Sequence, residues 1–448
     1  MTTEGFAKMQ NNEKVYLILP GCDDTNRGDQ ALIWETVSLA KKAGFIGEYF
    51  MLADPEKSKQ SEKENIGSID LVLPHPSTRF KKNNNISYGK MLKLKWAIVS
   101  VIDCAKAIAV LCPLFRKLAL KLGSAKLKKS LSVFDRADAA FVKGGGFLHA
   151  YGGLVSTYTV FYQLYHMMLA LSMKKDVYIM PNSYGPFKGP GSAWLVRKVI
   201  GRCKLVTARE SISQDALSQA TGVKAQLFPD LAFYLEPDTN LNSQQQKKLG
   251  TIPFESKKCI ALTMRPYRFP KSADPKAEYI KYKQTLCDFI KVLSSNGYHP
   301  VLIEHTYADN EHEQDMSCIK DVARMLGDCC DYTVYSDLSL TCRQLKYVYS
   351  RFEYIVGTRF HSVIFSVASG VPAIAVTYGG NKGQGIMKDI GIEDMSVPIE
   401  ELSNETLIKR FECLTRNKDA IVKKISDYIV KLEENQQELI TLLKDDNK

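Results

Sequence analysis

The stretch Gly357-Thr358-Arg359-Phe360-His361-Ser362 lies between two apolar segments of different kinds. The run Phe352–Val356 before it predicts a buried strand, and Ser362–Ala368 after it predicts a helix. A strand, a tight turn and a helix in succession are typical of an open parallel α/β sheet. In such a sheet, ligands bind at the carboxyl ends of the strands, and helix N-termini favour anions. The pattern therefore places Arg359 and His361 at a predicted anion site.

The two side chains also suit a reaction. Arg359 offers a bidentate fork for phosphate or carboxylate, and His361 can exchange a proton near neutral pH. The pair thus indicates acid–base chemistry on an anionic substrate. A structural arginine and a helix-capping histidine are the alternative, and the spacing alone does not separate the two.

The same alternation of strand and helix extends outward through both halves of the chain, which predicts an α/β fold with parallel sheets. We expect two doubly wound Rossmann-like domains facing a cleft, followed by a C-terminal helical extension. The N-terminal domain is expected over residues 1–235, a polar linker over 236–258, the C-terminal domain over 259–400 and the extension over 401–448. The predicted strands are Lys14–Pro20, Glu48–Leu52, Ser68–Leu73, Ala139–Val142, Asp176–Met180, Lys204–Thr207, Ala225–Phe228, Cys259–Met264, His299–His305, Tyr332–Tyr335, the run before Arg359, and Ala373–Val376.

Length and composition fit a soluble enzyme of two domains. The chain has 448 residues, of which 45% are hydrophobic and 24% are charged. Its N-terminus has no basic-then-apolar layout of a secretion signal, and its eleven cysteines are scattered and odd in number. We therefore expect a cytoplasmic protein without a disulfide framework. No pair of cysteines and histidines has zinc-ligand spacing, so no metal site is predicted.

The formal charge of +11 is concentrated in one insert, residues 79–129. This insert holds 13 Lys or Arg and the single acid Asp103, so the remainder of the chain is nearly neutral. Few aromatic residues accompany the basic ones, which argues against a nucleic-acid partner. The basic residues flank the apolar run Trp96–Phe115, and we expect it to lie as a helix in the interface of the inner membrane face. An ordinary buried helix with a solvated basic face is the alternative.

Three loops after predicted strands offer further binding groups. In the first, Asn26 and Asp29 flank the turn glycine Gly28, although helix capping also explains Asp29. In the second, the triple glycine Gly144, Gly145 and Gly146 would let the backbone approach a ligand or form an anion nest. In the third, Asn182, Ser183 and Tyr184 suit sugar hydroxyls, although turn formation also accounts for them.

Positive side chains gather at strand ends in both halves. Arg209 and Arg265 each close a predicted strand, as Arg359 nearly does, and Lys382 follows the next strand. Three arginines directed at one cleft suggest a multiply charged anion. His305 and His312 lie among acidic residues such as Glu313, where solvated charge is a better interpretation than a metal site.

Taken in order, these pieces resemble the polysaccharide pyruvyl transferase family. The matching set is Asn26-x-Gly28-Asp29, Lys143-Gly144-Gly145-Gly146, Asn182-Ser183-x-Gly185-Pro186, Arg209-Glu210-Ser211, Pro229-Asp230, Arg359-x-His361 and Gly370-x-Pro372. The resemblance implies a glycosyltransferase-B-type fold and transfer of the carboxyethylidene group of phosphoenolpyruvate onto two hydroxyls of a sugar. It implies that Arg359 and His361 are catalytic and that Arg209 helps hold phosphoenolpyruvate, for which Arg265 and Lys382 are also suited.

The implied partners are phosphoenolpyruvate as donor substrate, with no further cofactor, and a sugar or lipid-linked glycan as acceptor. A glycosyltransferase with a sugar-nucleotide donor is an alternative, because the same cleft would suit it. No clear acidic pair for ribose hydroxyls follows Arg359, which disfavours that alternative. A membrane-attached scaffold without catalysis is a second alternative, in which Arg359 and His361 would be replaceable.

Overall fold

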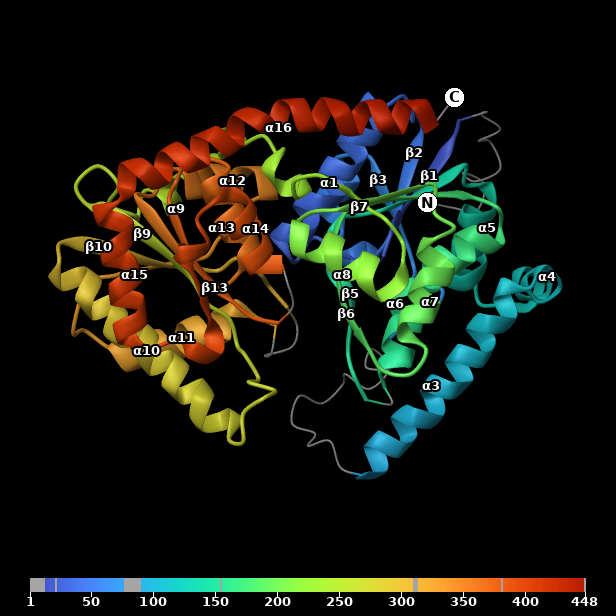
Figure 1. Cartoon of the computed structure of the whole chain (residues 1–448), viewed down its shortest axis with the longest axis horizontal. Coiled ribbons are helices and arrows are strands. Elements are labelled where there is room, and N and C mark those ends of the chain that lie inside the picture. Colours follow the sequence, from blue (N-terminus) through green and yellow to red (C-terminus); the bar gives the residue numbers. More distant parts are fainter. Residues whose placement is uncertain are drawn as a thin grey trace.

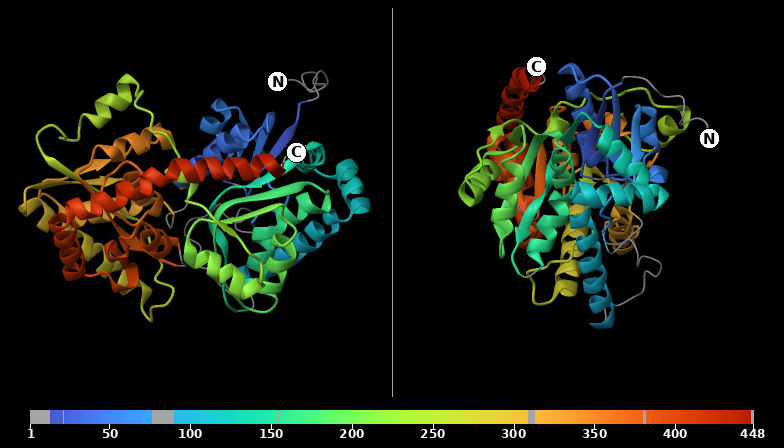
Figure 2. Two further views of the ribbon diagram at one scale, coloured as in Figure 1. Left: turned by 45° about the horizontal axis from the view of Figure 1, so that its top comes forward. Right: turned by 90° about the vertical axis from the view of Figure 1, so that its right-hand side faces the viewer.

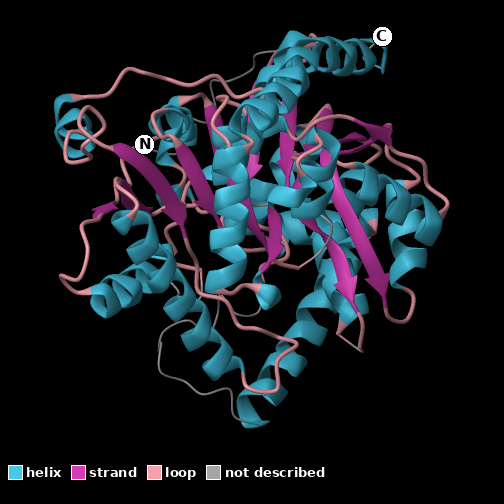
Figure 3. Cartoon of the chain, turned by 60° about the vertical axis from the view of Figure 1, so that its left-hand side comes forward, coloured by secondary structure: helices cyan, strands magenta, loops and turns pink. Residues whose placement is uncertain are grey.

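The computed structural model describes residues 13–20, 22–75, 90–153, 155–308, 313–379 and 382–446. These residues form two parallel β-sheets, each covered by helices, and the two sheets lie side by side in Figure 1. Figure 3 colours the helices and strands of the same chain differently. The predicted α/β class with two parallel-sheet domains is therefore confirmed.

The first sheet has eight strands in the order β3-β2-β1-β4-β6-β7-β8, with β5 paired to β6. The strands are β1 (Val15–Leu19), β2 (Glu48–Leu52), β3 (Ile66–Ile69), β4 (Ala139–Val142), β5 (Gly145–Tyr151), β6 (Asp176–Lys188), β7 (Leu205–Ala208) and β8 (Gln226–Leu227). The central strands β1 and β4 are buried along their whole length, as their continuous apolar sequences require.

The second sheet has six strands in the order β11-β10-β9-β12-β13-β14. They are β9 (Lys258–Thr263), β10 (Tyr298–Ile303), β11 (Thr333–Tyr335), β12 (Tyr354–Gly357), β13 (Ala373–Thr377) and β14 (Ser396–Pro398). Strand order therefore reverses between β9 and β12, just as it does between β1 and β4 in the first sheet. Ligands of open α/β folds bind at the carboxyl ends of such neighbouring strands.

Helices cover both faces of the sheets. They are α1 (Arg27–Lys42), α2 (Lys59–Lys63), α6 (Ser156–Ser172), α7 (Ser192–Ile200), α8 (Ser211–Thr221), α9 (Ser243–Leu249), α10 (Pro275–Ser295), α11 (Asp315–Leu326), α12 (Cys342–Ser350), α13 (Phe360–Val367), α14 (Lys382–Ile390) and α15 (Asn404–Arg416). The expected linker contains α9, whose capping box between Asn242 and Gln245 fixes its first turn.

Two predictions near the first switch point were wrong. The glycine run was expected as a loop, but β5 begins at Gly145. The stretch Asn182–Pro186 was expected as a turn, but it lies inside the long strand β6, where β5 pairs with it. Glycine, proline and asparagine are poor strand formers, so local preference pointed to a loop, and pairing between the two strands outweighed it.

The basic insert forms α3 (Lys90–Leu111), α4 (Pro113–Leu122) and α5 (Ala125–Arg136) along the outer edge of the first domain, as Figure 1 shows. The single helix expected over Trp96–Phe115 is broken at Cys112, because Pro113 begins a new helix and cannot continue the old one. Among the described residues, no single helix is long and apolar enough to cross a membrane. Only the pair Leu94–Leu111 and Pro113–Leu122 passes such a test together, with a bend of 111° between the helices.

The C-terminal helix α16 (Lys418–Asp446) returns from the second domain to the first, and the left panel of Figure 2 shows it spanning the two. Tyr428 of α16 packs its ring 5.2 Å from that of Phe233, at the end of the first domain. Leu439 and Leu443 are fully buried in a hydrophobic cluster that also contains residues of α1 and of the second sheet. The predicted C-terminal extension is thus a packed element that joins the two domains.

Candidate functional site

A cleft of approximately 1150 Å³ lies between the two switch points, where the carboxyl ends of both sheets face each other. Of the residues selected from the sequence, those that line it are Asn26, Asp29, Gly145, Gly146, Ser183, Arg265, Arg359 and His361. In the first sheet, β1 leads to Asn26 and Asp29, β4 leads to the two glycines, and β6 contains Ser183. In the second sheet, β9 leads to Arg265, and β12 leads to Arg359 and His361. The topology therefore brings together residues that are more than 300 positions apart.

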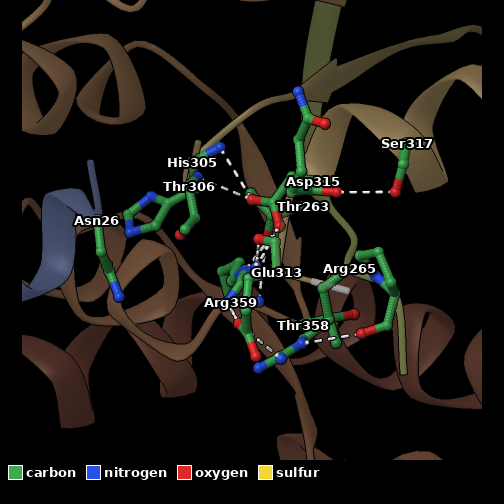
Figure 4. Close-up of polar contacts among 12 residues, drawn as sticks. Asn26, Thr263, Arg265, His305, Thr306, Glu313, Asp315, Ser317, Thr358 and Arg359 are labelled. Carbon is green, nitrogen blue, oxygen red and sulfur yellow. Dashed lines mark hydrogen bonds and ion pairs between the residues drawn. The ribbon is translucent and has the colours of Figure 1, made fainter. Parts of the chain in front are cut away.

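Arg359 is held by carboxylate and carbonyl oxygens at the base of the cleft (Figure 4). Its Nε donates to Asp315 Oδ1 at 2.7 Å, and its Nη2 donates to the Glu313 carbonyl oxygen at 2.6 Å. Burial acts to lower the pKa of Arg359, but the Asp315 carboxylate outweighs it and raises that pKa. Arg359 is therefore a permanent cation whose bidentate edge is already engaged by the protein.

Asp315 is itself fixed by the backbone. Its Oδ2 accepts hydrogen bonds from the amides of His305 at 3.1 Å and Thr306 at 2.9 Å, and Asp315 is fully buried at the start of α11. This arrangement orients the remaining nitrogen of Arg359, Nη1, which lies 3.6 Å from Glu313 Oε2. The segment around His305 was expected to be solvated charge, and that was wrong for His305 and its neighbour Glu304, which are both buried.

Arg265 approaches the same carboxylate from the end of β9. Its Nη2 donates to Glu313 Oε2 at 3.0 Å, and its Nη1 donates to the Tyr378 hydroxyl at 2.6 Å. The guanidinium also lies 4.6 Å from the centre of the Tyr378 ring. Two arginines therefore converge on one half-exposed carboxylate at the wall of the cleft.

His361 completes the site across the domain boundary. Its ring lies against Gly28 at the start of α1, where an added Cβ would come within 2.1 Å of Nδ1. Its Nε2 lies 4.0 Å from Asp230 Oδ2. Gly28 was expected to allow a tight turn, but it lies inside α1, and the close approach of the histidine is what requires a glycine.

Arg209 does not face the cleft as expected. Its side chain is fully buried and pairs with Asp230 through Nη1 at 2.6 Å, while Nε donates to Ser183 Oγ at 2.7 Å. The expectation failed because Arg209 forms a buried ion pair with Asp230, which follows β8 near the end of the same domain. Arg209 therefore positions Asp230 beside His361 and Ser183 beside the cleft.

Asn26 and Asp29 are hydrogen-bonded to each other, and Asp29 also pairs with a lysine at the end of β4. Asn26 caps α1 by accepting from the amides of Gly28 and Asp29, and its Nδ2 donates to Asp29 Oδ2 at 2.8 Å. Lys143, at the end of β4, pairs with Asp29. Burial acts to lower the pKa of Lys143, but Asp29 reverses the effect and raises it.

Three other selected residues lie behind the cleft wall. An added Cβ at Gly144 would meet the Pro181 carbonyl oxygen at 2.4 Å, so this glycine serves the approach of β4 to β6. Asn182 is fully buried, and Tyr184 is directed into the core, where its hydroxyl donates to the Thr207 carbonyl at 2.9 Å. The strand conformation of β6 explains this, because alternate side chains of a strand point to opposite faces, and of Asn182, Ser183 and Tyr184 only Ser183 lines the cleft.

Two predicted groups fall partly outside the described residues. Lys382 begins α14, but its side chain is not among the described parts, and neither is His312. Across the described ranges, no three His, Cys, Asp or Glu side chains gather as a metal site.

The structure adds four residues to which the sequence assigned no site role: Asp230, which was named only as part of the family-matching set, Glu313, which was expected as solvated charge, and Asp315 and His149. His149 of β5 also lines the cleft, and burial lowers its pKa, which keeps the imidazole neutral near pH 7. Asp230, Glu313 and Asp315 each pair with an arginine that the sequence had selected. The need of those arginines for a negative partner was the available signal, but the partners lie far away along the chain and could not be identified from it.

Comparison with known proteins agrees with this geometry. The model of the family described as "Polysaccharide pyruvyl transferase" matches residues 26–380, which include all eight cleft residues named above. The chain belongs to the polysaccharide pyruvyl transferase family. This member is accordingly a transferase enzyme of that family.

A curated relative supports the same assignment. The amylovoran biosynthesis protein AmsJ of Erwinia amylovora is 27% identical over 304 residues, covering 64% of this chain and 68% of that protein. It links a member of similar sequence to the synthesis of a named product, amylovoran.

Solved structures resemble this pyruvyl transferase in fold alone. The UDP-GlcNAc 2-epimerase of Neisseria meningitidis has a TM-score of 0.54 at 12% identity and covers 96% of this chain and 99% of its own. A glycosyltransferase from Rickettsia africae has a TM-score of 0.52 at 12% identity, with coverage of 98% and 100%. The expected glycosyltransferase-B-like arrangement of two domains is thereby confirmed.

Proposed function

We propose that this enzyme moves the carboxyethylidene group of phosphoenolpyruvate onto two hydroxyls of a sugar in a polysaccharide or its lipid-linked precursor, with release of phosphate. The convergence of Arg265 and Arg359 on the Glu313 carboxylate carries the proposal. A site that draws two guanidinium groups onto one carboxylate in the free protein is suited to an anionic donor. Phosphoenolpyruvate supplies a carboxylate and a phosphate for them.

The remaining cleft residues fit the proton transfers of this reaction. One sugar hydroxyl adds to C2 of the donor while a proton reaches C3, so the methylene becomes a methyl group. A second hydroxyl then displaces phosphate from C2, and its proton leaves with the phosphate. His361 serves one of these transfers, since Asp230 at 4.0 Å stabilises the imidazolium that forms. Arg265 and Arg359 stabilise the departing phosphate.

The acceptor has its own polar wall in the first domain. Asn26, Asp29 and Ser183 line the opposite side of the cleft and offer oxygen and amide groups suited to sugar hydroxyls. His149 adds a neutral imidazole on that side, which can accept a proton from a hydroxyl. The donor is thus assigned to the second domain and the acceptor mainly to the first.

The test is phosphate release from phosphoenolpyruvate by the purified full chain, with and without lipid-linked and nucleotide-linked sugars. We expect release that depends on an acceptor, lost in His361→Ala with an unchanged melting temperature. Arg324→Ala, which removes a mostly exposed arginine of α11, is the matched control and keeps full turnover. Absence of release with every acceptor, together with a melting shift caused by a sugar nucleotide, would favour the sugar-nucleotide glycosyltransferase instead. Near-normal turnover of His361→Ala would remove His361 from the mechanism.

A further inference from the structure

The outer surface of α3 and α4 is strongly apolar. Ten large hydrophobic side chains of these two helices are exposed, which is half of the twenty such residues in the described part of the chain. Val101 is 68% exposed and Leu122 is 77% exposed. We call this surface the α3–α4 face: Met91, Leu94, Ile98, Val101, Ile102, Ile108, Leu114, Phe115, Leu118 and Leu122.

This face is distinct from the side of α3 that packs on the protein. Ala107 and Val110 of α3 are buried in the core of the first domain, and the Tyr165 hydroxyl of α6 donates to the Ala107 carbonyl oxygen at 3.1 Å. Leu94, Ile98 and Val101 recur at helical spacing on the opposite side. The helix is therefore apolar on both sides, and only one of them finds a partner within the described chain. Solvent-exposed helices do not normally keep such a stripe.

The surroundings of the face carry charge of one sign. Residues 90–129 contain ten Lys or Arg and the single acid Asp103, which is buried. Exposed lysines flank the apolar stripe on both helices, among them Lys106, Lys117 and Lys121. Apolar side chains surrounded by lysines match an anionic lipid surface, in which the apolar groups enter the acyl boundary and the ammonium groups meet the headgroups.

The N-terminal half of α3 is connected to the cleft through α6 and β5. The His75 ring contacts Trp96 of α3 at 6.0 Å and Tyr162 of α6 at 5.3 Å, which ties the N-terminal half of α3 to α6. Helix α6 directly follows β5, whose last residue, Tyr151, lines the cleft. In Figure 1 the N-terminal end of α3 lies at the bottom of the view, on the same side as the ends of β5 and β6.

We propose that the α3–α4 face docks on the surface of a lipid bilayer rich in anionic lipid, with the exposed lysines of α3 and α4 at the headgroups. Docking of this kind holds the mouth of the cleft near the membrane. Combined with the proposed reaction, on which this last step rests, it makes a lipid-linked glycan the natural acceptor.

Vesicle sedimentation tests the docking without any assumption about the reaction. The purified full chain is mixed with vesicles of phosphatidylcholine containing about 25% phosphatidylglycerol and, separately, with pure phosphatidylcholine vesicles. We expect binding to the anionic vesicles that weakens as salt rises. The double variant Ile98→Glu/Val101→Glu should reduce the partition coefficient about tenfold or more, because it puts two acids into the apolar stripe. Both positions are exposed, so the fold should be kept.

Two matched controls and three outcomes decide the proposal. Ile280→Glu on α10 and Val430→Glu on α16 change residues that are 59% and 75% exposed elsewhere, and both should bind vesicles like the unmodified chain. Equal binding of the double variant would overturn the proposal, as would no binding of the unmodified chain to anionic vesicles. A concentration-dependent dimer that the double variant abolishes, without vesicle binding, would instead identify the face as a contact between two copies.

Turnover measurements distinguish the membrane-docking proposal from the proposed pyruvyl transfer. The double variant should lose turnover with a lipid-linked acceptor in vesicles but keep turnover with a water-soluble acceptor. Loss of vesicle binding with both activities intact would sever the link to a lipid-linked acceptor. Absence of all phosphate release, with vesicle binding intact, would refute the reaction and leave the docking standing.

Discussion

Gly28→Ala should disable the enzyme although it removes no charged or polar side chain. The new Cβ would lie 2.1 Å from Nδ1 and 2.7 Å from Cβ of His361, whereas ordinary contact begins at 3.4 Å. Rotation of the ring cannot relieve the contact with Cβ, so His361 as a whole must retreat by about 0.7 Å and its ring by about 1.3 Å. A misplacement of about 1 Å can cost a reaction roughly 100-fold, or about 2.7 kcal/mol of transition-state stabilisation.

Acceptor-dependent phosphate release measures the loss of kcat/KM, and urea unfolding measures stability in parallel. Crowding of this kind typically costs about 1–3 kcal/mol of unfolding free energy. In a His361→Gly background, which lacks both clashing groups, Gly28→Ala should leave the unfolding free energy unchanged. Gly250→Ala is the control, because its new Cβ would meet its nearest neighbour at 3.4 Å. Turnover of Gly28→Ala within threefold of the unmodified enzyme, or equal destabilisation in both backgrounds, would refute the reasoning.

Three further changes are predicted. Glu313→Gln removes the carboxylate that both arginines contact, so calorimetry should show phosphoenolpyruvate binding tightened by about threefold to tenfold; unchanged affinity would mean that Glu313 does not compete with the donor. Asp315→Asn removes the buried charge partner of Arg359, leaving the half-exposed Glu313 carboxylate at 3.6 Å, and should cost about 3–5 kcal/mol in urea unfolding, whereas a loss below about 1 kcal/mol would contradict the pairing. Burial raises the pKa of Glu210 to about 7, so the folded state keeps a proton that the unfolded state releases above about pH 4.5, and stability falls as pH rises through this window. Glu210→Gln should remove that slope, a gain of up to about 3 kcal/mol at pH 8; parallel pH–stability curves for the two proteins would rule it out.

The sequence predicted the architecture because hydrophobic periodicity is local. Strands such as β1, β4 and β12 are short apolar runs, and their alternation with helices leaves few other folds. The same logic placed Arg265, Arg359 and His361 at strand ends and hence in one cleft. Local pattern failed for β5 and the second half of β6, where pairing between two glycine- and proline-rich segments decides the conformation.

Partners that are distant along the chain were the second limit. Nothing near Arg209 announces that Asp230 will neutralise it, and nothing near Arg359 announces Asp315, because each pair forms only after folding. Gly28 shows the same limit in steric form: its neighbours suggest a turn, but its role is set by a histidine from the other domain. The sequence predicted that these arginines lie at strand ends, but it did not predict which carboxylate pairs with each of them.

Helix α16 packs against both domains along its length. The chain passes covalently from the first domain to the second ahead of β9, and α16 returns to the first domain, where it is attached by packing. Leu439 and Leu443 near the end of α16 are buried in the cluster that contains α1, so separating the domains there would expose these side chains to water. Burial of these leucines therefore favours the relative placement of the two domains that forms the cleft.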